Sequence, residues 1–92
     1  MSQSPPHPWS DLINKIVVVD LAVAVVYIGL LEALDDFSLT LTNCDVHDLI
    51  ATSRQQYLLE CKRNGYVPTR KSTRLRMETV LSVSLLDDVI AF

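Results

Sequence analysis

The feature that most constrains the fold is a nearly uninterrupted apolar stretch, residues 16–31, in which valine and isoleucine predominate. β-Branched side chains fit the pleated surface of a sheet better than they fit a helix. Asp20 interrupts the stretch near its start, and a helix that spans a membrane needs about 20 predominantly apolar residues. The stretch therefore predicts buried β-strands and no membrane partner.

A signal peptide is the alternative for the same stretch, because Ala22-Val23-Ala24 has the small-x-small form of a cleavage site. The residues before it hold Asp11 beside Lys15 and carry no net positive charge, which disfavours export. The two cysteines are too few for a disulfide framework and are expected to be reduced thiols. We therefore expect a cytoplasmic protein.

The length of the chain, 92 residues, predicts one domain rather than two, because so short a chain cannot hold two separate cores. Residues 1–8 contain three prolines and are expected to form a flexible leader. The domain itself is then expected to span residues 9–92, with a short helix after Ser10, whose side chain suits an N-cap.

Three strands are expected in the first half of the domain, at 15–20, 24–34 and 37–42. The third of them alternates apolar and hydroxyl side chains, as a half-buried strand does. Gly29 lies in the middle of the second strand, where a glycine is favourable only if the chain bends or another backbone comes close.

The second half of the domain begins with helical spacing over residues 45–64. Its best-marked part is 53–63, since Ser53 and Gln56 match a capping box and Gly65 supplies a stop. A long fourth strand is expected at 74–85 and a short fifth strand at 89–92. Five short strands in a domain of this size are typical of an SH3-like or OB-like barrel.

Two segments carry a more specific resemblance. Residues 27–41, YIGLLEALDDFSLTL, resemble the first Sm motif of the Sm/Sm-like family, and residues 85–92, LLDDVIAF, resemble a degraded second motif. The resemblance implies a mainly β fold: a small, strongly bent, five-stranded SH3-like barrel with a short N-terminal helix. The helical segment would be an insertion between strands 3 and 4, where the family has a variable loop.

The resemblance also implies a site for RNA. In the family an Asp-aromatic/His-x-Asn stretch holds a base, usually uracil, and an Arg-Gly pair of the second motif completes the pocket. Asp36 and Phe37 match the first positions, and Ser38 falls near the asparagine if one residue is deleted. Leu86-Asp87 falls on the Arg-Gly position. Ser38 offers a hydroxyl in place of an amide, and Leu86 brings no cation, so the uridine pocket is expected to be degraded.

Charge is distributed unevenly along the chain. Residues 54–76 hold seven of the eight basic residues and one acid, a net charge of +6, whereas the remainder carries −9. This distribution indicates single-stranded RNA as a partner, and the expected contacts besides the motif residues are Tyr66, Arg70, Lys71, Arg74 and Arg76. The alternative is a solvated segment whose cations pair with acids of the same chain or a neighbouring subunit.

Self-association is expected because the last predicted strand carries no lysine or proline to protect its edge. The resemblance implies rings of about six or seven identical subunits, in which the fourth strand of one subunit pairs with the fifth strand of the next. The expected interface residues are Val80, Ser82, Ser84, Val89, Ile90, Ala91 and Phe92.

Neither a metal site nor a catalytic site is expected. Cys44-x-x-His47 has a compact spacing, but a structural zinc site needs four ligands. The paired aspartates at 35–36 and 87–88 are typical of turns, and no phosphate loop or nucleophile motif is present. The sequence thus predicts an RNA-binding ring without cofactors or enzymatic activity, and the alternative is an oligomeric structural or protein-interaction module.

Overall fold

The structure, a computed structural model, describes residues 6–90. Its α-helix, five strands and three single-turn 3-10 helices follow one another in the order η1 (Ser10–Leu12), β1 (Ile16–Leu21), β2 (Val25–Leu34), β3 (Ser38–Asp48), α1 (Arg54–Asn64), β4 (Arg70–Arg76), η2 (Met77–Thr79), β5 (Val80–Leu85) and η3 (Leu86–Asp88). Most of the expected leader 1–8, and the interface residues Ala91 and Phe92, lie outside the described residues.

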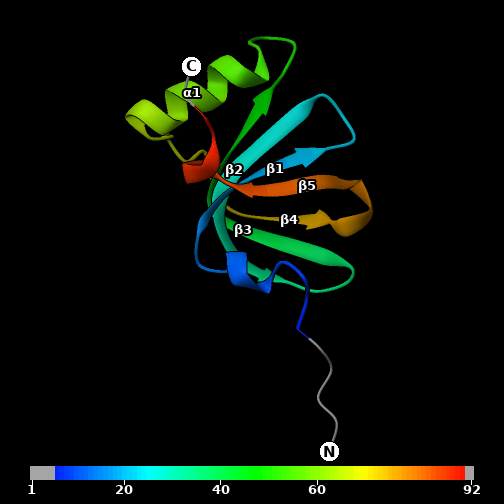
Figure 1. Ribbon diagram of the computed structural model, residues 1–92. Coiled ribbons are helices and arrows are strands. Elements are labelled where there is room, and N and C mark those ends of the chain that lie inside the picture. The colour runs from blue at the N-terminus through cyan, green and yellow to red at the C-terminus, as the bar shows by residue number, and fades with distance from the viewer. Residues whose placement is uncertain (1–5, 91–92) are drawn as a thin grey trace, which may run out of the picture.

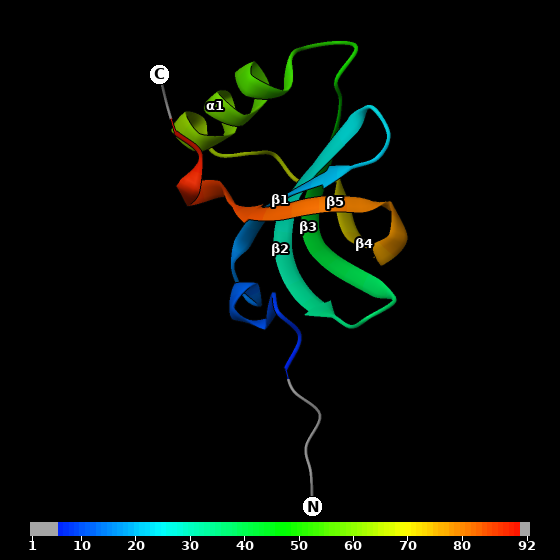
Figure 2. The same ribbon diagram turned by 45° about the vertical axis from the view of Figure 1, so that its right-hand side comes forward.

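The five strands form one strongly bent antiparallel sheet in the order β4-β3-β2-β1-β5, shown in Figure 1 and, turned, in Figure 2. The mainly β fold predicted from the sequence is confirmed. Strands β4 and β5 follow each other in the chain but lie at opposite edges of the sheet, so the barrel is not closed. Within residues 6–90, each of these two strands pairs on one side only, β4 with β3 and β5 with β1.

The bend depends on Gly29, as its place in the second strand predicted. A Cβ atom at position 29 would lie 2.5 Å from the Cβ of Cys44, because Cys44 of the paired strand β3 lies against this point of β2. The pairing register shifts between Ile28 and Leu30, and Asn43 on β3 adopts a positive φ of 46°. The two strands therefore curve together here, and a second register shift follows between Leu31 and Ala33.

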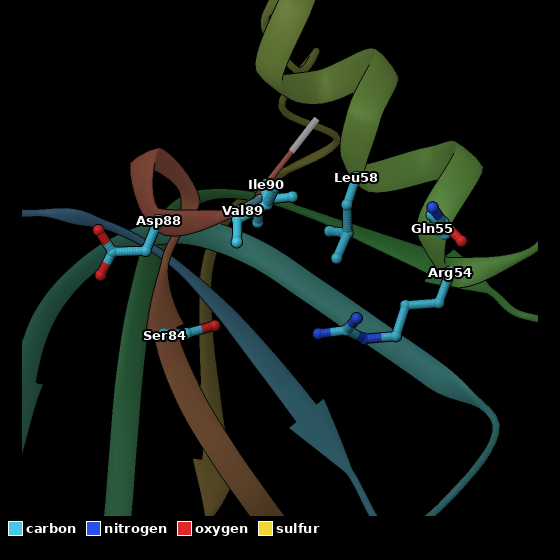
Figure 3. A pocket seen from close by; sticks show the side chains of 7 residues that line it. All are labelled: Arg54, Gln55, Leu58, Ser84, Asp88, Val89 and Ile90. Carbon is cyan, nitrogen blue, oxygen red and sulfur yellow. The ribbon is translucent and has the colours of Figure 1, made fainter. Parts of the chain in front are cut away.

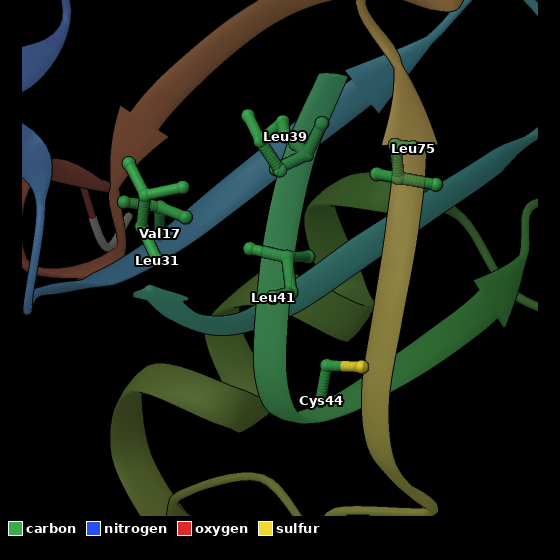
Figure 4. Packing of buried hydrophobic residues seen from close by; sticks show 7 residues of the cluster. Val17, Leu31, Leu39, Leu41, Cys44 and Leu75 are labelled. Atoms are coloured by element: carbon green, nitrogen blue, oxygen red, sulfur yellow. The ribbon is translucent and has the colours of Figure 1, made fainter. Parts of the chain in front are cut away.

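Apolar side chains fill both faces of the sheet. The inner core lies on its concave face (Figure 4) and consists of Val17, Val19, Leu31, Leu39, Leu41, Cys44 and Leu75. The outer core lies on the other face and consists of Val18, Val26, Ile28, Leu58, Cys61 and Leu86. Leu58 and Cys61 come from α1, so this helix covers part of the outer face.

The α1 helix matches the expectation of a helix at 53–63 to within a residue. The Ser53 hydroxyl accepts a hydrogen bond from the Gln56 N–H at 3.2 Å, and the Gly65 N–H donates to the Cys61 carbonyl. At its first turn the Arg54 guanidinium donates two hydrogen bonds to the Asp20 carboxylate, at 2.7 and 2.9 Å. These bonds anchor α1 to β1.

Two other helical expectations need correction. Residues 45–48 continue β3, because the positive φ of Asn43 restarts the alternation and places Asp45 and His47 beside α1 while Cys44 enters the inner core. The N-terminal helix is present as a single 3-10 turn, in which Trp9 rather than Ser10 occupies the N-cap position and makes no side-chain capping bond.

The expected fourth and fifth strands also need correction. Residues 74–85 do not form one strand, because η2 reverses the chain at 77–79 and the Thr79 hydroxyl donates to the Arg76 carbonyl at 2.7 Å to close that turn. The fifth strand is therefore residues 80–85. Val89 and Ile90 belong to no strand, and η3 precedes them. The expected edge at 89–92 is thus wrong for the two described residues, and β5 provides the free edge instead.

Candidate nucleic-acid interface

The loop between β2 and β3 presents an aromatic ring to solvent. The Asp35 carboxylate accepts hydrogen bonds from the N–H groups of Phe37 and Ser38, at 2.7 and 2.8 Å, and these two bonds hold its pKa below the usual value. The turn leaves the Phe37 side chain 82% exposed. An exposed ring held by its own backbone is a platform on which a base can stack.

The η2 turn lies against this loop. The Met77 N–H donates to the Phe37 carbonyl at 2.8 Å, and Arg76 pairs with Ser38 at the end of the β3–β4 ladder. Together the loop and the turn form one shallow pocket of about 250 Å³, which we call the tip pocket. It is lined by Asp36, Phe37, Arg76 and Glu78. Two segments about 40 residues apart in the sequence thus build one site.

The position assigned to Leu86-Asp87 in the second motif is wrong. Leu86 is buried in the outer core with α1, and the Asp87 carbonyl accepts a hydrogen bond from Lys62, a residue of that helix. Arg76 and Met77 occupy the place beside Phe37 instead. The pocket therefore contains a cation where the motif resemblance predicted none, and this cation, Arg76, is paired at 3.3 Å with Glu78 of the same pocket.

The other predicted contacts fall into two groups. Arg74 lies on the same outward face of β4 as Arg76, opposite Thr40, and lines a second hollow with Asp35, Ser38 and Thr40. The structure therefore brings Asp36, Phe37, Ser38, Arg74 and Arg76 together around one end of the sheet.

The second group lies at the start of β4, about 20 Å away along that strand. Here Arg70 donates to the Tyr27 hydroxyl at 3.4 Å, and Lys71 is exposed. The Tyr66 hydroxyl donates to the Asn43 carbonyl at 2.5 Å, and burial raises its pKa. Tyr66 is therefore anchored to the sheet and does not lie beside Phe37.

Sequence reasoning missed a polar cluster that fixes α1 to the end of β3. The Tyr57 hydroxyl donates to Asp45 at 2.6 Å, and the Thr69 hydroxyl donates to the same carboxylate at 2.7 Å. Burial, followed by the bond to Asp45, raises the pKa of Tyr57. His47 stacks on Tyr57, with ring centroids 4.0 Å apart, and its Nε2 donates to the Thr52 carbonyl at 3.1 Å.

This cluster does not collect metal ligands. Cys44 lies in the inner core while His47 lies on the outer face, and nowhere in residues 6–90 do three or more potential ligands gather. The polar groups of the cluster bond to one another, so their arrangement supports a structural role. Within residues 6–90, no helix has both the length and the apolar character needed to cross a lipid bilayer.

The free edge of β5 holds three of the expected interface residues. The Ser82 hydroxyl donates a hydrogen bond to the Asp20 carboxylate at 3.0 Å. Val80 and Ser84 pair with β1 along the other edge of β5. Val89 and Ile90 follow η3 and line a groove of about 420 Å³ between β5 and α1 (Figure 3). These two residues therefore flank the free edge without extending it.

No protein-family model and no curated protein matches the chain. Several solved structures, however, have a similar fold. The Sm-like protein AF-Sm2 from Archaeoglobus fulgidus has a TM-score of 0.60 at 19% identity, covering 90% of this chain and 99% of its own. An Sm protein from Pyrococcus abyssii, solved in complex with a uridine heptamer, has a TM-score of 0.57 at 16% identity, covering 87% and 99%.

A chain of the NatC complex, solved bound to CoA, is also similar, with a TM-score of 0.58 at 14% identity over 89% of this chain and 88% of its own. The fold of the protein is therefore Sm-like, which confirms at the level of the fold the resemblance carried by residues 27–41.

Proposed function

We propose that the protein binds single-stranded RNA as a closed ring of identical subunits. The observation that carries this proposal is the tip pocket, in which Phe37 and Arg76 come together from two distant segments. An Sm protein with the same fold was solved with a uridine heptamer, which supports RNA as the ligand class.

The tip pocket suits a stacked base beside a phosphate. An aromatic ring that stacks on a base contributes about 1–3 kcal/mol, and every base offers a face for it. Arg74 and Arg76 supply cations for the backbone. Ser38 has one hydroxyl in place of the family's amide, so we expect the ring to bind RNA with little preference for uracil.

The two free edges of the sheet support assembly. Soluble proteins protect such edges or pair them, and a head-to-tail contact between β4 and the β5 of a neighbour closes into a ring when the rotation permits. The β4 edge carries exposed Arg70 and Lys71, and β5 is followed by exposed Asp87 and Asp88. Opposite charges on the two surfaces favour their contact. By the resemblance we expect about six or seven subunits.

A protein-interaction module is the second candidate. The acidic surface after β5 can pair with the basic surface of β4 and leave fewer cations for RNA. The likeness to a chain of the NatC complex supports a role of this kind, since that chain was solved within a larger assembly.

Binding of fluorescent oligo-U and oligo-A, measured by anisotropy at several salt concentrations, distinguishes the two functions. Phe37→Ala is expected to weaken binding of both by about 5- to 140-fold, which corresponds to the loss of one stacked base. Arg76→Ala should lower the slope of log K against log salt by about 0.7. Arg63→Ala removes an exposed cation of α1 and serves as the matched control, with affinity unchanged. Wild-type protein that binds neither oligonucleotide leaves only the interaction module.

A further inference from the structure

A groove with a largely apolar lining lies between α1 and β5, apart from the tip pocket. Its floor and one wall are apolar and consist of Leu58, Val89 and Ile90 (Figure 3). The rest of its lining is polar or charged and consists of Arg54, Gln55, Ser84 and Asp88. Its volume is about 420 Å³, and Ile90 is 70% exposed. An apolar side chain from outside could therefore enter it.

The wall of this groove is held in place. Lys62 of α1 donates hydrogen bonds to the carbonyls of Asp87, at 3.0 Å, and Val89. Leu86, immediately before them, is buried against the helix. The groove is thus formed before any partner arrives, which lowers the entropic cost of filling it.

The groove adjoins the free edge of the sheet. Ser84 lines it from β5 and pairs with Val18 of β1 on its other side. A strand added to β5 from a second subunit would therefore run past the mouth of the groove.

The strand that we propose to add there is β4, and the loop before it carries an exposed apolar side chain. Val67 is 78% exposed and is followed by Pro68. The loop is anchored on either side, by the bond from Tyr66 to Asn43 and by the N–H of Thr69, which donates to the Cys44 carbonyl at 3.0 Å. Val67 is thus presented at a fixed place, just before the start of β4.

We infer that the groove of each subunit receives Val67 and Pro68 of the next. Every ladder in the sheet is antiparallel, and antiparallel pairing of β4 with a neighbour's β5 places the start of β4 beside the end of β5. The residues before β4 then lie over the groove. The inserted helix α1 would act as one wall of a subunit contact. This inference rests on the proposed self-assembly and adds the partner of the groove.

The contact leaves the tip pocket free. The α1 helix lies at one end of the sheet, and the loop between β2 and β3 lies at the other end (Figure 1). In a cyclic assembly all α1 helices share one face, since every subunit has the same orientation to the axis. The RNA site and the groove contact can therefore be tested separately.

Cross-linking of co-expressed variants that each carry one added cysteine tests the inference. Val67→Cys and Ile90→Cys, mixed and mildly oxidised, should give a disulfide-linked dimer, and the double variant should give a ladder up to the full ring. Each single variant alone should give no such species, and neither should the wild type, because Cys44 and Cys61 are buried. Sedimentation before oxidation establishes whether the variants assemble. Assembled rings without the mixed dimer overturn the groove contact but not the ring, whereas a monomeric wild type overturns both.

A charge in the groove provides a second test. Val67→Asp should raise the dissociation constant of the subunit contact by about tenfold or more, since the side chain can no longer be buried. Val67→Ile keeps an apolar side chain of similar shape and should assemble as the wild type does. Equal dissociation constants for Val67→Asp and Val67→Ile would overturn the inference.

Discussion

The substitution Gly29→Ala examines the bend on which the whole sheet depends. A Cβ atom at this position would lie 2.5 Å from Cβ and 3.1 Å from Cα of Cys44, and 3.3 Å from the carbonyl oxygen of Thr42. Ordinary contact begins at 3.4 Å, so β2 and β3 would have to move apart by about 0.9 Å. Two of the three obstructing atoms belong to the backbone, and β3 is paired on both sides. The strand cannot yield without disturbing its ladders.

The expected cost follows from that displacement. Overpacking of a filled site costs about 1–3 kcal/mol, and each weakened ladder hydrogen bond adds about 1 kcal/mol. We expect the free energy of unfolding to fall by about 3–5 kcal/mol, and the melting temperature to fall by roughly 15–30 °C for a domain of this size. Thermal and urea unfolding followed by circular dichroism measure both quantities.

Two further variants show whether the contact with Cys44 is the cause. Cys44→Gly removes the nearest obstructing atom, so it should cost less in the Gly29→Ala background than in the wild type, with a coupling energy of at least about 1 kcal/mol. Gly65→Ala is the control, because Gly65 has a φ of 78° and no heavy atom within 4 Å of the added Cβ. That variant should lose only about 1–3 kcal/mol of backbone strain and show no coupling to position 44. A loss below about 1 kcal/mol for Gly29→Ala would refute the reasoning.

Three other variants probe the helix anchor, the acid response and the loop. Tyr57→Phe leaves Asp45 without one of its donors and should lower the free energy of unfolding by about 1–2 kcal/mol, as urea titration would show. Burial opposes ionisation of Asp20, but hydrogen bonds from Arg54 and a serine hydroxyl outweigh it and leave the pKa below 3.8. Its contribution to stability is complete above that pH and is lost as the pH falls through the lowered value, so Asp20→Asn should flatten the acid limb of a stability–pH curve. Asp35→Ala removes both turn bonds and should weaken RNA binding in anisotropy, whereas Asp35→Asn keeps an accepting oxygen and should retain it.

Much of the fold was predictable because local signals agreed with the tertiary structure. The apolar stretch predicted β1 and β2, the capping box at Ser53 predicted α1, and Gly29 in the second strand predicted the bend. The end of β3 was not predictable in this way. A single positive φ at Asn43 moves the alternation by one residue, and the remaining pattern of apolar residues then matches a helix.

The candidate site was predictable in part. Phe37 and Arg76 were both expected to contact RNA, but no sequence signal placed them together, because no glycine or proline marks the turn at 77–79. The resemblance then placed the second motif at Leu86-Asp87, a segment that is instead held by α1. The tyrosine–aspartate cluster under α1 was also missed, since its members are far apart in the chain and match no motif.

The mass of the native assembly, measured by native mass spectrometry and sedimentation at micromolar concentration, tests the central claim most directly. The account predicts a single closed species whose mass is a whole multiple of 10.3 kDa, with about six or seven subunits. A stable species of 10.3 kDa would contradict it, because the β4 and β5 edges would then remain unpaired in solution.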